Sequence, residues 1–81
     1  MAKYRKKPVV IDAWQWIGNL NEMPVPPVPH SVLRKNWFGW QIKTIEGWLK
    51  LTPEDWIIRG VQGEYYPIKP DIFAETYEPA E

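Results

Sequence analysis

The sequence predicts an α+β domain: a small twisted antiparallel sheet, or half-barrel, of about five strands with two short helices. Three observations predict it. Short runs of β-branched and aromatic residues alternate with turn residues, as is typical of strands joined by hairpins. The expected turns are too short for crossover connections, so successive strands should be antiparallel. In two other segments a proline lies at or just before the expected first turn, as is typical of short helices. A chain of 81 residues is expected to form a single domain, 1–81.

The first expected strand is 8–16 (PVVIDAWQW), which follows a basic N-terminal arm at residues 1–7. β-branched and aromatic residues dominate it. Alternate positions from Val9 to Ala13 mark one apolar face, but Trp14 and Trp16 make the other face apolar as well. A strand that is apolar on both faces is central in its sheet or has one side covered by another element or chain.

Residues 20–29 are rich in proline, which fixes φ and removes a backbone donor, so we expect an extended loop there. This proline-rich loop is interpreted as a stiff connector, with a docking peptide as the alternative. Residues 30–35 (HSVLRK) are expected to form the first short helix, because Pro29 precedes its first turn and cations lie at its end. Asn36 would then end it.

Four more strands are expected, at 37–44, 48–52, 56–59 and 64–68. Glycines in the turns at 45–47 and 60–63 supply the positive φ that tight hairpins need. A further tight turn is expected at 53–55, where the fixed φ of Pro53 suits a turn. Pro67 places the last strand at an edge of the sheet or ends it there. Residues 70–77 are expected to form the second helix, since Pro70 suits the first helical position and Phe73 and Tyr77 lie four apart on one face.

The composition argues against several classes of function. Ten basic and ten acidic residues give no net charge, so no overall field attracts nucleic acid, and nucleic-acid binding is unlikely. No apolar run is long enough for a signal peptide or a membrane span, so we expect a cytoplasmic protein with no membrane partner. The chain has no cysteine and a single histidine, which excludes disulfides and argues against a structural zinc site. No cofactor is expected.

Catalysis has little support in the residues. Ser31 adjoins the single histidine, and residues adjacent in sequence rarely form a catalytic pair. No glycine pattern of a phosphate-binding loop is present. Asp12 lies in an otherwise apolar strand, but a carboxylate that hydrogen-bonds on a strand face is the more ordinary interpretation. The protein is therefore expected not to be an enzyme.

Six tryptophans are more than the interior of so small a domain can hold at native packing density. The expected core aromatics are Phe38, Trp40, Trp56 and Phe73. The remaining indoles are Trp14, Trp16, Trp37 and Trp48, and two or three of these four are expected to be partly exposed. An exposed apolar patch usually marks an interface.

Three uses of these exposed rings stay open. The first is self-association into a small homo-oligomer. The second is a site for a nucleotide-like molecule, whose base would stack on Trp16, Trp37 or Trp48 while Lys43 or Arg59 meets its phosphates. The third is docking on another protein.

Residues 55–78 (DWIIRGVQGEYYPIKPDIFAETYE) resemble a family of small proteins encoded by bacteriophages and prophages. The opening, at 6–11 (KKPVVI) and again at Gln15 and Trp16, is similar to that family's start. The proline-rich segment and residues 37–40 look peculiar to this chain. The resemblance implies a phage origin and action inside the host cell, but it assigns no role to any residue.

Together these observations predict a non-enzymatic phage-encoded binding module that counteracts host defence by sequestering a nucleotide-like signal through exposed aromatics. The alternatives are an inhibitor that masks a host protein, or a structural or accessory phage protein. A hydrolase is the least favoured interpretation.

Overall fold

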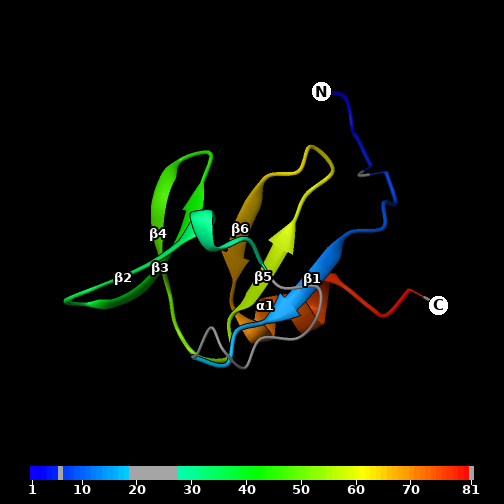
Figure 1. Cartoon of the computed structure of the whole chain (residues 1–81). Coiled ribbons are helices and arrows are strands. Elements are labelled where there is room, and N and C mark those ends of the chain that lie inside the picture. Colours follow the sequence, from blue (N-terminus) through cyan, green and yellow to red (C-terminus); the bar gives the residue numbers. More distant parts are fainter. Residues whose placement is uncertain (6, 19–27, 81) are drawn as a thin grey trace.

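Two antiparallel sheets and one short α-helix make up the part of the chain that the structure, a computed structural model, describes, namely residues 1–5, 7–18 and 28–80 (Figure 1). The first sheet has the strand order β1-β5-β6, with the bounds Asp12–Gln15, Trp56–Arg59 and Tyr65–Ile68. The second has the order β2-β3-β4, with the bounds Leu33–Asn36, Gly39–Thr44 and Gly47–Leu51. A 3-10 helix, η2 (His30–Val32), precedes β2, and helix α1 (Pro70–Thr76) follows β6.

The predicted fold class, one sheet of about five strands with two helices, is therefore wrong. Residues 33–36 form β2 instead of the end of a helix. Leu33 lies opposite Ile42 in the register of β2 and β3, and both side chains are buried in the core. A helix at this point would have left the edge of β3 unpaired and Leu33 without this neighbour. Only residues 30–32 keep a helical turn.

The second cause of the error is the connection between β4 and β5. We expected a hairpin turn at 53–55, but this segment carries the chain from one sheet to the other. Its backbone pairs with the end of the first strand: the Trp16 N–H donates to the Asp55 carbonyl at 2.7 Å, and the Glu54 N–H donates to the Trp16 carbonyl at 2.7 Å. Glu54 adopts a φ of +77° to make this bend, a conformation that favours glycine.

Several expected elements are confirmed. β5 has the expected bounds, and α1 begins at Pro70 as the proline rule predicts. The turn between β3 and β4 ends on Gly47 at a φ of +109°. The turn between β2 and β3, which we did not expect, has the same form: Asn36 pairs with Gly39, whose φ is +114°. The expected proline-rich loop at 20–29 lies outside the described residues except for its last two.

The β1-β5-β6 sheet is the middle of three layers. Trp14 lies opposite Ile57 on the side that faces β2-β3-β4, and both belong to the core between the sheets. The other side faces α1, where the Phe73 ring stacks on Trp56 with centroids 3.9 Å apart and planes 5° apart. Ile58 is fully buried on that second side. Helix α1 therefore covers the side of the β1-β5-β6 sheet that faces away from the second sheet.

The core between the sheets holds two of the four indoles among which we expected two or three to be partly exposed. Trp16 is 0% exposed and Trp14 is 8% exposed. The Trp16 ring meets Trp40 edge to face at 5.2 Å, so these indoles link the two sheets. Phe38, an expected core residue, is 82% exposed, because it belongs to the turn before β3 and not to the strand. Alternation counted through the turn assigned it to the wrong face.

A pair of tyrosine hydroxyls ties α1 to the middle sheet. Their oxygens, on Tyr66 of β6 and on Tyr77 just after α1, lie 3.4 Å apart. Burial, with a smaller contribution from this hydrogen bond, raises the pKa of Tyr66 from 10.0 to about 12. The folded protein therefore holds this proton more tightly than the unfolded chain does.

This raised pKa predicts a loss of stability in alkali. Below pH 10 the contribution of Tyr66 is complete, and it is lost as the pH rises from 10 towards 12, because the unfolded chain gives up the proton first. Ultraviolet difference titration should show one tyrosine that ionises later than the others. In Tyr77→Phe this late step should move to lower pH. A single common step for all tyrosines in the wild-type protein would contradict the assignment.

Candidate ligand-binding face

The β2-β3-β4 sheet turns one face to the core and the other to solvent. Leu33, Ile42 and Leu51 point inwards and are buried. Alternation therefore directs their neighbours outwards. The side chains that share the outward face are mainly cationic or amide-bearing, grouped around one indole: Arg34, Gln41, Lys43, Trp48 and Lys50. We call these five residues the cationic face.

The guanidinium of Arg34 is held over the indole of Trp48. Its Cζ lies 4.1 Å from the centre of the ring, well inside the range of a cation–π contact. The Arg34 Nε also donates to the Gln41 Oε1 at 2.7 Å. The same oxygen accepts a hydrogen bond from the Asn36 Nδ2 at 3.2 Å. Gln41 thus fixes the arginine across β3, and the guanidinium becomes a flat, charged platform.

The charged side chains of the cationic face all have the same sign. Arg34, Lys43 and Lys50 are exposed cations, and no Asp or Glu occupies an outward position on β2, β3 or β4. Lys43 lies directly opposite Trp48, and Lys50 lies opposite Gln41. The two lysines therefore flank the stacked pair on neighbouring strands. Such a face can hold a planar group against the guanidinium and an anion against the ammonium groups.

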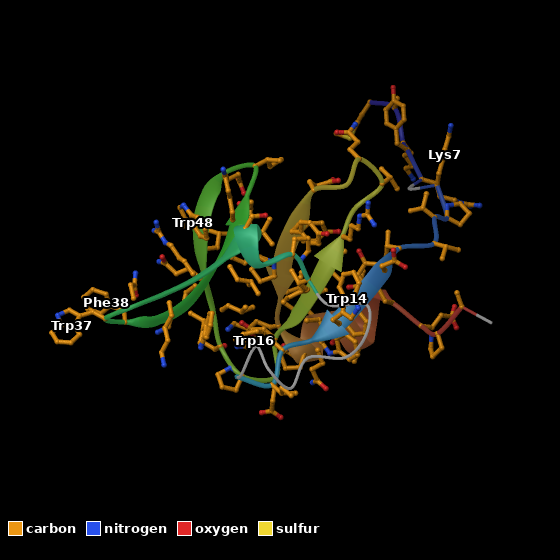
Figure 2. All side chains as sticks on the ribbon, in the orientation of Figure 1. Lys7, Trp14, Trp16, Trp37, Phe38 and Trp48 are labelled. Carbon is orange, nitrogen blue, oxygen red and sulfur yellow. The ribbon has the colours of Figure 1, made fainter. Side chains whose placement is uncertain are left out.

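The turn between β2 and β3 carries two exposed aromatic rings at one end of the molecule (Figure 2). Trp37 is 95% exposed and Phe38 is 82% exposed. The turn itself is ordered by a hydrogen bond from the Phe38 N–H to the Asn36 Oδ1 at 2.9 Å, which is an Asx-type turn. We call Trp37 and Phe38 the aromatic tip.

The six residues predicted for the site do not all lie together (Figure 2). Lys43 and Trp48 form a cross-strand pair on the cationic face. Trp37 lies at the aromatic tip, at the end of the hairpin. Trp14 and Trp16 are in the core, so neither ring is open to a ligand from solvent, and the expectation that a base stacks on Trp16 is wrong.

Arg59 belongs to the other sheet. It lies on β5 opposite Asp12 of β1, in the sheet that packs on the core side of β2-β3-β4, whereas Lys43 and Trp48 point to the solvent side of their sheet. The structure therefore does not bring Arg59 together with Trp48. The prediction treated all hairpins as parts of one sheet, which would have brought Arg59 closer to Lys43.

Sequence reasoning missed Arg34, Gln41 and Lys50. Arg34 was assigned to a helix, so its place opposite Gln41 was not considered. One signal could have found it: Asn36 and Gly39 have the spacing of a tight hairpin turn, with apolar residues on either side in register. The same alternation places Gln41 and Lys50 outwards with Trp48.

The buried carboxylate of Asp55 is the other charged group that invites a functional interpretation. It is 2% exposed and accepts hydrogen bonds from the backbone N–H and the hydroxyl of Thr52, both at 2.9 Å. Lys69 donates to it at 3.1 Å. These contacts occupy the carboxylate oxygens and connect the β4–β5 segment to the residue before α1, so Asp55 stabilises the fold.

Comparisons with known proteins add no relative: no family model, no curated protein and no solved structure matches this chain. The resemblance to phage proteins therefore stays a prediction. In the described residues, neither helix is long and apolar enough to cross a lipid bilayer. Those residues also contain no group of three or more acidic or histidine side chains placed to hold a metal ion.

Proposed function

We propose that this protein is a non-enzymatic binding module that captures a nucleotide-like molecule on the cationic face. The base lies flat on the Arg34 guanidinium, which is itself stacked on Trp48. The phosphates meet the ammonium groups of Lys43 and Lys50. The observation that carries the proposal is the 4.1 Å contact between Arg34 and the Trp48 ring, which a hydrogen bond from Arg34 to Gln41 holds in place.

The chemistry of this face suits a base with phosphates better than either part alone. Stacking a base on an aromatic or guanidinium plane contributes about 1–3 kcal/mol. A hydrogen bond to a charged group contributes about 1.5–3 kcal/mol. A stacked base and two phosphate contacts, less the cost of association, correspond to a micromolar or weaker dissociation constant. Ligands with two or more phosphates use both lysines and should bind most tightly.

The resemblance to phage proteins supports a biological role for this capture. A phage protein that binds a nucleotide signal in the cytoplasm of its host lowers the free concentration of that signal. Sequestration needs no catalytic group, in keeping with the saturated hydrogen bonding of Asp55. We propose this as the way in which the module counteracts host defence.

The test is a calorimetric titration with a panel of adenosine, AMP, ATP, cyclic dinucleotides and inorganic pyrophosphate. We expect nucleotides with several phosphates to bind more tightly than adenosine or pyrophosphate. Arg34→Ala should weaken binding at least about tenfold, since one charge-assisted contact is worth about that factor. Arg59→Ala is the matched control, because it removes an exposed arginine from the other sheet, and its affinity should equal that of the wild type.

Two results would contradict the proposal. One is that no member of the panel produces heat or raises the melting temperature. The other is that Arg34→Ala and Arg59→Ala weaken binding equally, which would indicate a general attraction of anions to a basic surface.

A further inference from the structure

The side-chain amide of Gln41 lies in the middle of the cationic face, and its orientation is fixed by two neighbours. Its Oε1 accepts hydrogen bonds from the Arg34 Nε at 2.7 Å and from the Asn36 Nδ2 at 3.2 Å. A guanidinium has donors but no acceptor, so the atom that Arg34 contacts is the amide oxygen. The other end of the amide, Nε2, therefore carries its two N–H groups away from Arg34.

Asn36 sets the same orientation independently. Its Oδ1 accepts a hydrogen bond from the Phe38 backbone N–H at 2.9 Å, and a backbone N–H can only donate. The atom of Asn36 that contacts Gln41 is thus the amide nitrogen, which needs an acceptor. Rotating the Gln41 amide by half a turn would place N–H groups against N–H groups at both contacts.

The Gln41 Nε2 is an unused donor on the solvent side of the sheet. Among the described residues it donates to no acceptor, and it is not a buried atom. In the register of the sheet, Gln41 lies between Arg34 on β2 and Lys50 on β4. The two free N–H groups therefore lie beside the guanidinium on which we place the base.

The outward side of β2-β3-β4 offers hydrogen-bond donors to a ligand. Arg34, Lys43 and Lys50 have donors only. The side-chain acceptors at the outward positions of these described strands are the amide oxygens of Asn36 and Gln41, and both already accept hydrogen bonds within the network. An amino group of a ligand that faced this network would find donors in place of acceptors, whereas a ligand oxygen or ring nitrogen would be matched.

Resting on the nucleotide site proposed above, we propose that the cationic face selects guanine nucleotides and that the Gln41 amide recognises the base. Guanine has two neighbouring acceptors, N7 and O6, on one edge. Adenine has N7 beside an amino group, cytosine has an amino group, and thymine has a single acceptor. A guanine that lies flat on the Arg34 guanidinium can present N7 and O6 to the Gln41 Nε2. An adenine in the same place would bring its amino group against the same N–H groups.

The first experiment compares nucleotides that differ only in the base, by calorimetric titration of the wild-type protein. GTP and ATP carry the same triphosphate, so their contacts with Lys43 and Lys50 are equal. We expect GTP to bind about five- to tenfold more tightly, at the lower end of the discrimination that contacts to a base edge provide. ITP keeps N7 and O6 but lacks the 2-amino group, and it should bind like GTP. In 7-deaza-GTP a C–H group replaces N7, and most of the preference over ATP should be lost.

The second experiment changes the protein with Gln41→Glu. The glutamate keeps an acceptor for Arg34 and Asn36, but it replaces the N–H groups with a second acceptor oxygen. Its negative charge weakens both triphosphates equally, so the ratio of the two affinities is the quantity to compare. We expect ATP to bind more tightly than GTP in this variant. Gln62→Glu is the matched control, because it makes the same exchange at an exposed residue between β5 and β6 and should keep the wild-type ratio.

The outcomes distinguish this proposal from the proposed function. If no triphosphate binds, the nucleotide site fails and base selection fails with it. If GTP and ATP bind equally and Arg34→Ala weakens both, the nucleotide site stands and the guanine preference is overturned. ITP that binds like ATP would mean that the 2-amino group is recognised instead, and an unchanged ratio in Gln41→Glu would exclude Gln41 as the recognising residue. Circular dichroism establishes that each variant is folded before affinities are compared.

Discussion

Replacing Trp16 with alanine is expected to remove a large fraction of the free energy of unfolding, about 3–5 kcal/mol. The Trp16 side chain is fully buried and is the largest of the fully buried side chains among the described residues. It contacts Trp40 across the space between the sheets, so its loss opens a cavity where the two sheets meet. Removing a buried tryptophan costs about 3–5 kcal/mol. A chain of 81 residues has only about 4–12 kcal/mol of stability in total.

Urea unfolding followed by circular dichroism measures this loss. Trp37→Ala is the matched control, because it deletes the same side chain from a position that is 95% exposed, and its stability should lie within about 0.5 kcal/mol of the wild type. Trp16→Phe should fall between the two. If Trp16→Ala and Trp37→Ala lose equal stability, the indole of Trp16 does not occupy the centre of the core.

Asp55→Ala is expected to destabilise the fold by about 2–3 kcal/mol. The carboxylate is almost completely buried, and its removal leaves the Thr52 N–H without its acceptor inside the protein. It also releases Lys69, which holds the residue before α1 against the β4–β5 segment. The penalty should remain below that of breaking a wholly buried ion pair, because the Lys69 side chain is 58% exposed and can return to water.

Lys69→Met separates the two contributions to this network. It removes the ammonium group but leaves both hydrogen bonds from Thr52 to the carboxylate. Since the pair is exposed on the lysine side, we expect a loss of about 1 kcal/mol or less in chemical denaturation. A Lys69→Met variant as unstable as Asp55→Ala would mean that the ion pair, and not the turn, is the main stabilising interaction.

The comparison of sequence with structure separates local information from long-range pairing. Strand β5, helix α1 and the glycine turns follow from residues close together in the chain, and these were predicted. The division into two sheets was not, because it depends on β1 pairing with β5 across most of the chain. Hydrophobic alternation indicates where strands lie but does not specify which strands become neighbours.

Residues 33–36 show how a local preference is overruled. A short helix was predicted at 30–35 because Pro29 precedes it and cations lie at its end, and Leu, Arg and Lys are also good helix formers. In the fold, Leu33 instead gains a buried place opposite Ile42, and the Asx turn at Asn36 closes the hairpin. The gain from burying an aliphatic side chain exceeds the small propensity difference. Arg34 then becomes an outward strand residue, which is why it was absent from the predicted site.

To predict which tryptophans are buried, one must likewise know which strands and helices pack together over long range. A first strand that is apolar on both faces was expected to be central or covered. It is covered on both sides, by α1 and by the second sheet, and this is what places Trp14 and Trp16 in the interior. Exposure of surplus rings was expected from the packing limit, and it occurs at Trp37. The packing limit did not specify which of the four candidate indoles would be exposed.

Because its indoles differ in exposure, the intrinsic tryptophan fluorescence of this protein reports on two regions separately. Trp37 is surrounded by water, whereas Trp16 is enclosed by aliphatic and aromatic side chains. Acrylamide should therefore quench the long-wavelength edge of the emission first and leave the short-wavelength edge until the chain melts. One unlabelled sample then yields two signals, with the red edge following contacts made by the hairpin end and the blue edge following the integrity of the interior.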